Sequence, residues 1–328
     1  MRGAPAVTLE HVALAAGVSR ATASRVLTGS GPASEDARRK VLGAADRLGY
    51  AADPVARALV TGRGTRLVVA VTSATDAVLD DPYLARVVSA AARVADGDGL
   101  GVSVRWLPLP DPTSGLEQLA RDRTVGAVVL VNTTEPLLQV LPAALRGRAV
   151  SIGVGARHVP AVDVDNGAGA RTVVEHLLRS GRRRVALITG PGWLPCAQRP
   201  VTAYRSAMRA AGLPERVLPG DFGDAAGRRR AVEAVTRWPD TDAVFALGDA
   251  AALGALAGLR SVGRDVPGDV AVAGYDDIPA AAHSGPALTT ATHPVERIAT
   301  AAAEAALRPG AAAEEIWFGS ELVVRDSA

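Results

Sequence analysis

The chain lacks most of what secreted, membrane and metal-binding proteins use. It has one cysteine, Cys196, which excludes an internal disulfide framework, and its five scattered histidines offer no metal-ligand spacing. Polar residues, glycines and prolines end the apolar runs before they reach the roughly 18 residues of a membrane span. No apolar stretch of signal-peptide length opens the chain. We therefore expect a cytoplasmic protein with no metal, cofactor or membrane partner.

Aromatic residues are also scarce, at 3% of 328 residues, so alanine, valine and leucine must carry the packing. A content of 48% hydrophobic and 21% charged residues excludes a disordered chain and a simple coiled coil. The net charge of +2 is unevenly distributed: residues 1–65 hold nine basic and five acidic residues, and the remainder holds 27 and 29. A basic module joined to a near-neutral body is typical of a polyanion-binding head on a receptor.

One stretch near the N-terminus has the layout of a helix-turn-helix. A helix is predicted over residues 8–16, with Thr8 as its N-cap. Gly17 supplies the left-handed backbone that the turn requires, and a second helix follows over residues 19–27. A third helix over residues 34–49 completes a small bundle. The second helix of such a motif lies in the major groove of DNA.

The second helix carries residue types that can read DNA. Arg20 and Ala21 open it, at the point where side chains meet base edges. An arginine can donate two hydrogen bonds to guanine O6 and N7, whereas an alanine can only contact a thymine methyl group. Thr22 and Arg25 follow along the same helix. The alternative interpretation is that these four are ordinary solvent-exposed helix residues.

A short segment over residues 53–61 follows the bundle. Pro54 suits the first turn of a helix. Because the segment has only about two turns, it is too short to be stable as an isolated helix. We expect it to fold only when something else orders it, and Gly62 and Gly64 then interrupt the chain.

From residue 66 onward, apolar runs alternate with amphipathic stretches. The apolar runs are 67–72, 101–107, 126–131, 149–154, 184–189, 243–247 and 270–274. The amphipathic stretches are 83–96, 114–122, 136–145, 167–180, 199–211, 225–237 and 249–262. Continuous apolar runs are typical of buried parallel strands, so this alternation predicts an α/β fold with doubly wound parallel sheets. The number of units indicates two lobes, with a crossing at residues 162–166.

Several short motifs occur together in one order. They are Val7-Thr-Leu9, Ala16-Gly-Val-Ser19, Ser24-Arg-Val-Leu27, Leu48-Gly-Tyr50, Val164-Asp-Asn166, Ser180-Gly-Arg-Arg-Arg-Val-Ala-Leu-Ile-Thr-Gly190, Gly274-Tyr-Asp-Asp-Ile-Pro279 and Pro286-Ala-Leu-Thr-Thr290. With these motifs the chain resembles the lactose/galactose repressor family of bacterial transcription regulators along nearly its whole length.

The resemblance implies an N-terminal three-helix helix-turn-helix head, a hinge helix, and a two-lobed core like a periplasmic sugar-binding protein. The expected boundaries are 1–62 for the head with its hinge helix and 66–328 for the core, with 66–163 plus 292–312 in the first lobe and 164–291 plus 313–328 in the second. It also implies a homodimer on a palindromic operator. A small molecule between the lobes would order or release the hinge helices. No leucine heptads follow residue 310, which argues against a tetramerising coil.

The resemblance also assigns roles to residues of the head and hinge. Arg25 would contact a base. The residues assigned to phosphates are Thr8, Ser19, Ser24 and Tyr50. Leu59 would insert into a minor-groove step and kink the duplex, with Ala56 beside it. The alternative is that Leu59 packs against the body, and Asp53 departs from the asparagine that is common in the family.

Two aspartates follow predicted strands, Asp249 after 243–247 and Asp276 after 270–274. Ligands of open α/β sheets bind at the carboxyl ends of strands, and carboxylates accept hydrogen bonds from sugar hydroxyls. Both match ligand positions of the family. The alternatives are that Asp249 caps its helix and that Asp276 serves a turn.

Three further residues match ligand positions of the family. Arg199 offers a planar fork of donors, and Phe222 and Tyr83 offer flat faces to a sugar ring. The alternatives are a surface salt bridge for the arginine and core positions for the two aromatic residues. The effector is predicted to be a sugar or sugar derivative, and a non-sugar such as a nucleoside is the alternative.

The sequence offers little support for an enzyme. Gly153-Val-Gly155 is a lone GxG without the glycine that completes a dinucleotide-binding motif, and no Gly-x-Ser-x-Gly element is present. We therefore predict a sequence-specific DNA-binding transcriptional regulator that is cytoplasmic and associated with the nucleoid, not an enzyme. Repression is the expected mode, and ligand-dependent activation is the alternative.

Overall fold

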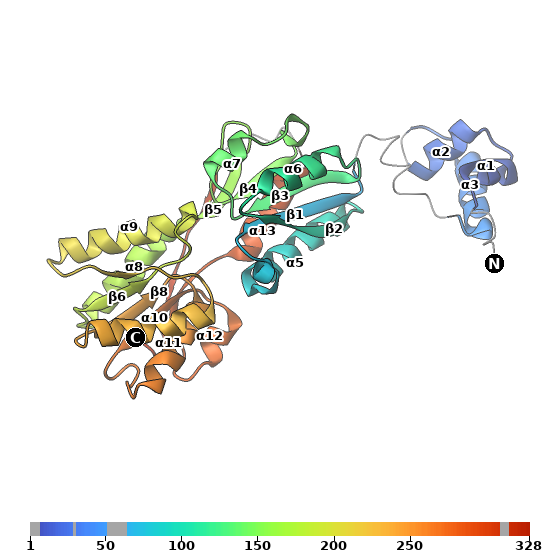
Figure 1. Cartoon of the computed structure of the whole chain (residues 1–328). Coiled ribbons are helices and arrows are strands. Elements are labelled where there is room, and N and C mark those ends of the chain that lie inside the picture. The colour runs from blue at the N-terminus through green and yellow to red at the C-terminus, as the bar shows by residue number, and fades with distance from the viewer. Residues whose placement is uncertain (1–6, 29–30, 51–63, 309–314) are drawn as a thin grey trace, which may run out of the picture.

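The computed structural model describes residues 7–28, 31–50, 64–308 and 315–328. Three helices form the head: α1 (Leu9–Ala16), α2 (Arg20–Thr28) and α3 (Glu35–Leu48). In Figure 1 the head lies apart from two α/β lobes, and the first lobe lies between the head and the second lobe. The predicted hinge segment 53–61, with Ala56 and Leu59, lies outside the described residues.

Local interactions fix the helix ends of the head as predicted. The Thr8 hydroxyl accepts a hydrogen bond from the backbone N–H of His11, and the His11 ring accepts one from the N–H of Thr8. Gly17 ends α1 with φ of 64°, in the left-handed region that favours glycine. The bundle core consists of Val12, Ala13, Ala16, Ala23, Val26, Val41, Ala44 and Ala45.

A six-stranded parallel sheet organises the first lobe. Its strands, in spatial order, are β11 (Ile316–Phe318), β5 (Ala161–Val164), β4 (Ala149–Ile152), β3 (Val125–Val131), β1 (Arg66–Ser73) and β2 (Gly101–Pro108). Its helices are α5 (Pro82–Gly97), α6 (Pro112–Arg121), α7 (Glu135–Gln139) and α13 (Val295–Leu307), with 3-10 turns η1 (Asp76–Asp80) and η2 (Ala143–Leu145). Helices α5 and α13 cover one face, and α6, α7 and η2 cover the other.

A second six-stranded sheet organises the second lobe. Its strands, in spatial order, are β12 (Leu322–Val323), β10 (Thr289–Thr292), β9 (Ala271–Asp276), β8 (Ala243–Ala246), β6 (Val185–Ile188) and β7 (Arg216–Leu218). Its helices are α8 (Asn166–Arg179), α9 (Pro195–Ala210), α10 (Asp224–Arg237), α11 (Asp249–Ser261) and α12 (Pro279–His283). Helices α8 and α9 cover one face, and α10 and α11 cover the other.

The predicted fold class is confirmed, with three corrections. Strand β12 runs antiparallel to β10, so the second sheet is mixed and not purely parallel. The predicted helix 136–145 is interrupted, because Pro142 has no N–H to continue the helix and a 3-10 turn follows it. Strand β11 belongs to the first sheet, although residues 313–328 were expected in the second lobe. This strand has only three apolar residues and is largely exposed, so its apolar run is too short to indicate a buried strand.

Within residues 64–308 and 315–328, the chain crosses between the lobes three times. The crossings lie between β5 and α8, between β10 and α13, and between β11 and β12. Asn166 therefore begins the second lobe directly after the first crossing, and His293 lies on the second crossing. These three crossing segments form the hinge between the lobes, which is distinct from the predicted hinge helix 53–61. A ligand that contacts them is therefore sensitive to the angle between the lobes.

Among the described residues, every helix is too short or too polar to span a lipid bilayer.

Candidate DNA-binding and effector-binding sites

Helix α2 presents its polar side to solvent. The Ser19 hydroxyl caps the helix, accepting the backbone N–H of Thr22 at 3.2 Å. Arg20, Ala21 and Arg25 are exposed. The capped N-terminus and the exposed side chains together make a surface that fits the predicted recognition helix.

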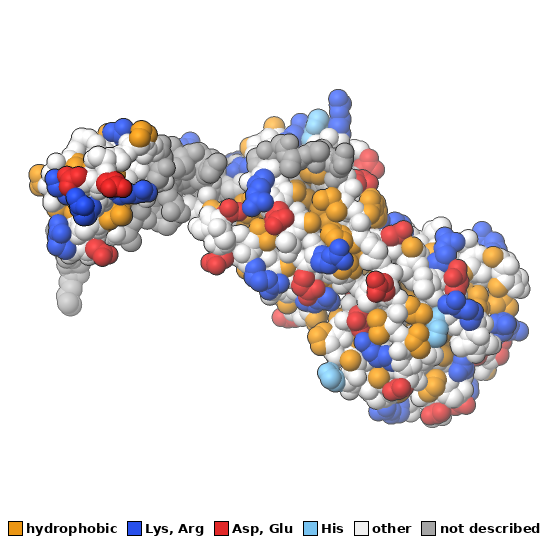
Figure 2. All heavy atoms as spheres, turned by 180° about the vertical axis from the view of Figure 1, so that it is seen from behind, with side chains coloured by type: hydrophobic (Ala, Val, Ile, Leu, Met, Phe, Trp, Pro, Cys, Tyr) orange, Lys and Arg blue, Asp and Glu red, His pale blue; other side chains and the backbone are white. Residues whose placement is uncertain are grey.

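The two arginines of α2 make only weak contacts within the head. Arg20 lies 3.7 Å from Glu10, and both side chains are about 70% exposed, so the pair stabilises the head little. Arg25 donates long hydrogen bonds of 3.4 Å to the Ala21 carbonyl and the Thr22 hydroxyl. Basic and acidic side chains are interspersed on the face of the head seen in Figure 2. Both guanidinium groups can therefore exchange their present partners for DNA at little cost.

The four residues assigned to phosphates differ in accessibility. Thr8 and Ser19 are exposed at the N-termini of α1 and α2, where backbone N–H groups and the helix dipole favour an anion. Ser24 is half-buried within α2, and Tyr50 packs against the bundle core directly after α3.

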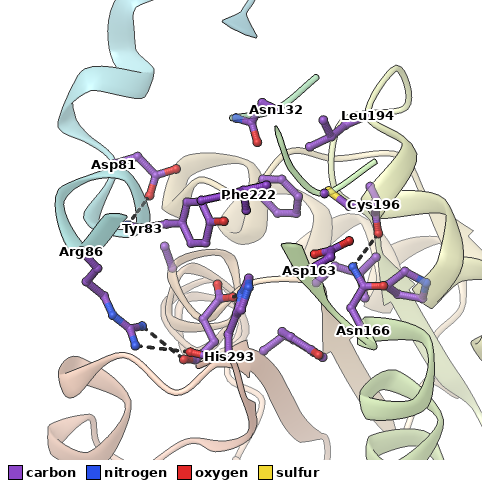
Figure 3. A pocket seen from close by; sticks show the side chains of 18 of the residues that line it. Asp81, Tyr83, Arg86, Asn132, Asp163, Asn166, Leu194, Cys196, Phe222 and His293 are labelled. Atoms are coloured by element: carbon purple, nitrogen blue, oxygen red, sulfur yellow. Dashed lines mark hydrogen bonds and ion pairs between the residues drawn. The ribbon is translucent and has the colours of Figure 1, made fainter. Parts of the chain in front are cut away.

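A cavity of about 1120 Å³, including the space open at its mouth, lies between the two lobes. Tyr83, Asn132 and Asp163 line it from the first lobe, and Phe222 lines it from the second (Figure 3). Asp276 also lines it from the second lobe. Asn132 follows β3 and Asp276 ends β9, so the cavity opens at the carboxyl ends of strands, as in other open α/β sheets.

Of the five predicted effector residues, the structure brings three to this cavity: Tyr83, Phe222 and Asp276. Asp249 does not line it, because its side chain is completely buried. Arg199 does not line it either, because its guanidinium group lies against Asp163.

Asp249 instead holds the loop that follows β9. Its carboxylate accepts the backbone N–H of Ile278 at 2.9 Å and the hydroxyl of Thr290 at 2.6 Å. Burial, together with the nearby charge of Asp276, raises the pKa of Asp249 to about 8. Asp276 and Asp277 have φ of 114° and 49°, so this loop has a backbone conformation that needs such support.

Arg199 joins the two lobes. It extends from α9 of the second lobe and forms an ion pair with Asp163 of β5 in the first lobe. Its guanidinium carbon also lies 4.8 Å from the ring centre of Trp317 in β11. Asp163 and Trp317 are direct cross-strand partners in the sheet. The arginine is therefore held between two neighbours on one sheet.

A second cluster of polar residues lies at the end of β9, beside the crossing between β10 and α13. Asp276 Oδ1 lies 2.9 Å from Nδ1 of His293, whose ring centre is 5.2 Å from that of Tyr83. Arg86 of α5 donates to the carbonyls of Asp276 and His293 at 3.4 and 3.3 Å and pairs with Glu296. The Glu296 carboxylate raises the pKa of Arg86, which therefore stays charged. These contacts hold both lobes at the side of the cavity.

Several polar residues of the cavity wall were not predicted from the sequence, namely Asp81, Arg86, Asn132, Asp163, Asn166 and His293. Asn132 directly follows a predicted strand, and Asp163 lies in the predicted crossing, so position alone marked both. His293 had no such signal, because the strand before it was not predicted. Among the described residues, no group of three or more His, Cys, Asp or Glu is arranged to hold a metal ion.

Two family models match the chain. The model described as "Bacterial regulatory proteins, lacI family" matches residues 8–53, and the "Periplasmic binding protein-like domain" matches residues 174–328. The HTH-type transcriptional regulator CelR of Thermobifida fusca is 37% identical over 306 residues, which are 88% of this chain and 87% of that protein. The HTH-type transcriptional regulator GalR of Escherichia coli K12 is 30% identical over 312 residues, 92% and 88% of the two chains.

Two solved structures are similar over nearly the whole chain. One is described as a transcriptional regulator CelR–cellobiose complex, with a TM-score of 0.70 and 32% identity over 98% of this chain and 100% of that chain. The other is the Lac repressor dimer bound to operator and the anti-inducer ONPF, with a TM-score of 0.85 over 98% and 99% of the chains. At 23% identity the second similarity concerns the fold alone.

Proposed function

The chain belongs to the lacI family of bacterial regulatory proteins, and from that premise we propose that it represses transcription and releases its operator when a carbohydrate binds between its lobes. Family membership makes it a DNA-binding transcriptional regulator and not an enzyme. We propose repression as the mode of regulation, a carbohydrate as the effector, and the roles of the individual site residues.

The lining of the cavity supports a carbohydrate. Tyr83 and Phe222 offer flat apolar faces, which suit the C–H face of a pyranose ring. Asp81, Asp163 and Asp276 offer carboxylate oxygens, which accept hydrogen bonds from hydroxyl groups. The combination of aromatic rings with an excess of acceptors is the observation that carries the proposal. Because the solved CelR relative is a cellobiose complex, cellobiose is the first effector to test.

For the DNA interface we propose the roles that the resemblance implies. Arg20 and Arg25 contact base edges, Ala21 and Thr22 complete the reading surface, and the Thr8, Ser19, Ser24 and Tyr50 side chains contact phosphates. The solved Lac repressor is a dimer on its operator. We extend that arrangement to this chain, so that two heads contact the half-sites of a palindrome.

The cavity position supports a mechanism for release. Because its walls belong to different lobes, a ligand that binds both walls favours one angle between the lobes. The head precedes the first lobe in the chain, so a change of lobe angle in the dimer alters the spacing of the two heads on DNA. The coupling is reciprocal: operator binding lowers the affinity for an inducing effector by the same factor.

The test is release of DNA by the full-length protein. Fluorescence anisotropy would follow binding to DNA from upstream of its own gene, with cellobiose, other sugars and nucleosides added in turn. We expect cellobiose to release the DNA from the wild-type protein, and Asp276→Asn to bind DNA normally but to need at least about tenfold more cellobiose. Equal release in this variant would reject the cleft assignment. Release by nucleosides alone would reject the carbohydrate.

A further inference from the structure

Two side chains that line the cavity lie at crossings between the lobes, and each carries a buried hydrogen-bond acceptor. Asn166 begins α8 directly after the first crossing, and His293 lies on the second crossing, between β10 and α13. Both line the cavity and are labelled in Figure 3. Neither belongs to the five effector positions predicted from the sequence.

The orientation of the Asn166 amide is fixed by its own hydrogen bond. Its Nδ2 donates to the backbone carbonyl of Cys196 at 2.8 Å. The other end of the amide, Oδ1, is therefore the acceptor that remains. It is buried, and it has no hydrogen-bond partner among the residues that the structure describes.

The tautomer of His293 is fixed in the same way. A carboxylate only accepts hydrogen bonds, so the 2.9 Å contact with Asp276 Oδ1 places a proton on Nδ1. In the neutral ring Nε2 then carries a lone pair. It is buried and unpartnered within the described part of the chain. The rings of Tyr83 and Tyr275, with centres 5.2 and 6.1 Å from the imidazole, restrict its rotation.

Resting on the proposed function, we propose that Asn166 Oδ1 and His293 Nε2 select the effector by accepting hydrogen bonds from two of its hydroxyl groups. A buried acceptor without a donor is costly, so an effector that supplies both donors gains over one that lacks either. Sites built to bind a hydroxyl group discriminate strongly against the analogue without it, because the protein acceptor is then left unpaired.

The location of these acceptors also couples effector binding to the angle between the lobes. Both are attached to crossing segments, whose backbone changes when the lobes rotate. An effector held by both acceptors therefore contacts the hinge itself as well as the two walls. Loss of either contact should weaken the release of DNA together with the affinity for the effector.

Two substitutions separate the roles of the two imidazole nitrogens. His293→Asn places an amide N–H near the position of Nδ1, so it preserves a donor for Asp276 and removes the acceptor. His293→Gln extends its amide to the position of Nε2 and can restore an acceptor there. His283→Asn, on the exposed helix α12, is the matched control.

The experiment is calorimetric titration of full-length protein with cellobiose and its six ring-monodeoxy analogues. We expect His293→Asn to bind cellobiose about tenfold more weakly than the wild type. One deoxy analogue, which lacks the donor to Nε2, should bind both proteins equally. His293→Gln should recover part of the loss, and His283→Asn should match the wild type. Asn166→Leu should give the same pattern with a different analogue.

The outcomes are distinguishable. If His293→Asn binds cellobiose as tightly as the wild type and discriminates equally against the deoxy analogues, the proposed role of these acceptors is overturned. The proposed function is then unaffected. If the wild type binds its DNA but binds neither cellobiose nor any other sugar tested, the carbohydrate proposal fails and this inference fails with it. Binding of operator DNA by each variant without effector verifies that the variants are folded.

Discussion

Arg199 and Asp163 form an ion pair that joins the two lobes at the wall of the cavity. The carboxylate is 6% exposed and the arginine side chain is 31% exposed, so separation of the lobes at this point would leave a nearly buried charge without its partner. Trp317 covers the guanidinium group from the neighbouring strand. The pair therefore favours the lobe arrangement seen here.

Replacement of that carboxylate should loosen the lobes. Asp163→Asn keeps the shape of the side chain and removes its charge. We expect the free energy of unfolding to fall by about 1–3 kcal/mol, and small-angle X-ray scattering should show a larger radius of gyration without effector. Glu117→Gln is the control, because its pair with Arg121 is exposed and should contribute less than about 0.5 kcal/mol. An unchanged radius of gyration would mean that the pair does not restrain the lobes.

Asp249 predicts a dependence of stability on pH. Its pKa is about 8 in the folded protein, above the ordinary value of 3.8, so the folded state holds a proton that the unfolded state has released. Its contribution is therefore fully present below about pH 4, and it is lost as the pH rises toward 8. Asp249→Asn stays neutral and lacks this loss.

Urea unfolding of both proteins from pH 5 to pH 9 would measure the effect. We expect the free energy of unfolding of Asp249→Asn to rise relative to that of the wild type as the pH increases. A pKa shift of this size implies a difference of about a few kcal/mol over this range. Asp265→Asn, at an exposed position, is the control and should run parallel to the wild type. A constant difference between Asp249→Asn and the wild type across this range would contradict the shifted pKa.

Local signals in the sequence were sufficient for most of the fold. Thr8, Gly17 and Ser34 mark helix ends of the head through caps and a left-handed turn, which depend only on neighbours in the chain. The long apolar runs mark the central strands because both faces of those strands are buried. Strands β7, β10, β11 and β12 are only two to four residues long, so their pairing depends on the sheet and not on a local pattern.

The effector site was less accessible from the sequence. Tyr83, Phe222 and Asp276 were placed by motif and strand position, and they do line the cavity. Asp249 has the same kind of position, yet its side chain turns inward to partners 29 and 41 residues away. His293 is recruited by a crossing that only the assembled lobes define. Side-chain direction and long-range partners are tertiary properties, and spacing along the chain does not determine them.

Arg20 predicts base selectivity in the operator. Because its present contact with Glu10 is exposed and long, the guanidinium group is available to bind a guanine with two N–H groups. We expect Arg20→Ala to lose discrimination at one base pair in each half-site, worth about 1–3 kcal/mol per site. Anisotropy titrations with single-base operator variants would measure it. Arg47→Ala, exposed on α3, should leave discrimination unchanged, and an equal loss with every operator sequence would identify Arg20 as a phosphate contact.

A substitution at Gly190 tests how strongly the affinity for the effector depends on the position of the Phe222 ring. A Cβ at Gly190 would overlap the Phe222 ring, whereas a Cβ at Gly192 would meet no atom within 4 Å. Gly190→Ala should therefore turn the ring away from its place in the cavity wall. Because an aromatic stacking contact is worth about 0.5–1.5 kcal/mol, we expect the affinity for cellobiose to fall by a factor of about 2 to 13. Gly192→Ala should bind cellobiose as the wild type does.

Calorimetry on the two alanine variants, with operator binding measured in parallel, would separate the site from the fold. Gly190 follows β6 of the second lobe, and the first lobe lies between that lobe and the head in Figure 1, so both variants should bind operator with wild-type affinity in the absence of effector. Phe222→Ala should lose at least as much affinity for cellobiose as Gly190→Ala. If Phe222→Ala bound cellobiose normally, the ring would be a packing residue of the second lobe and would make no contact with the effector.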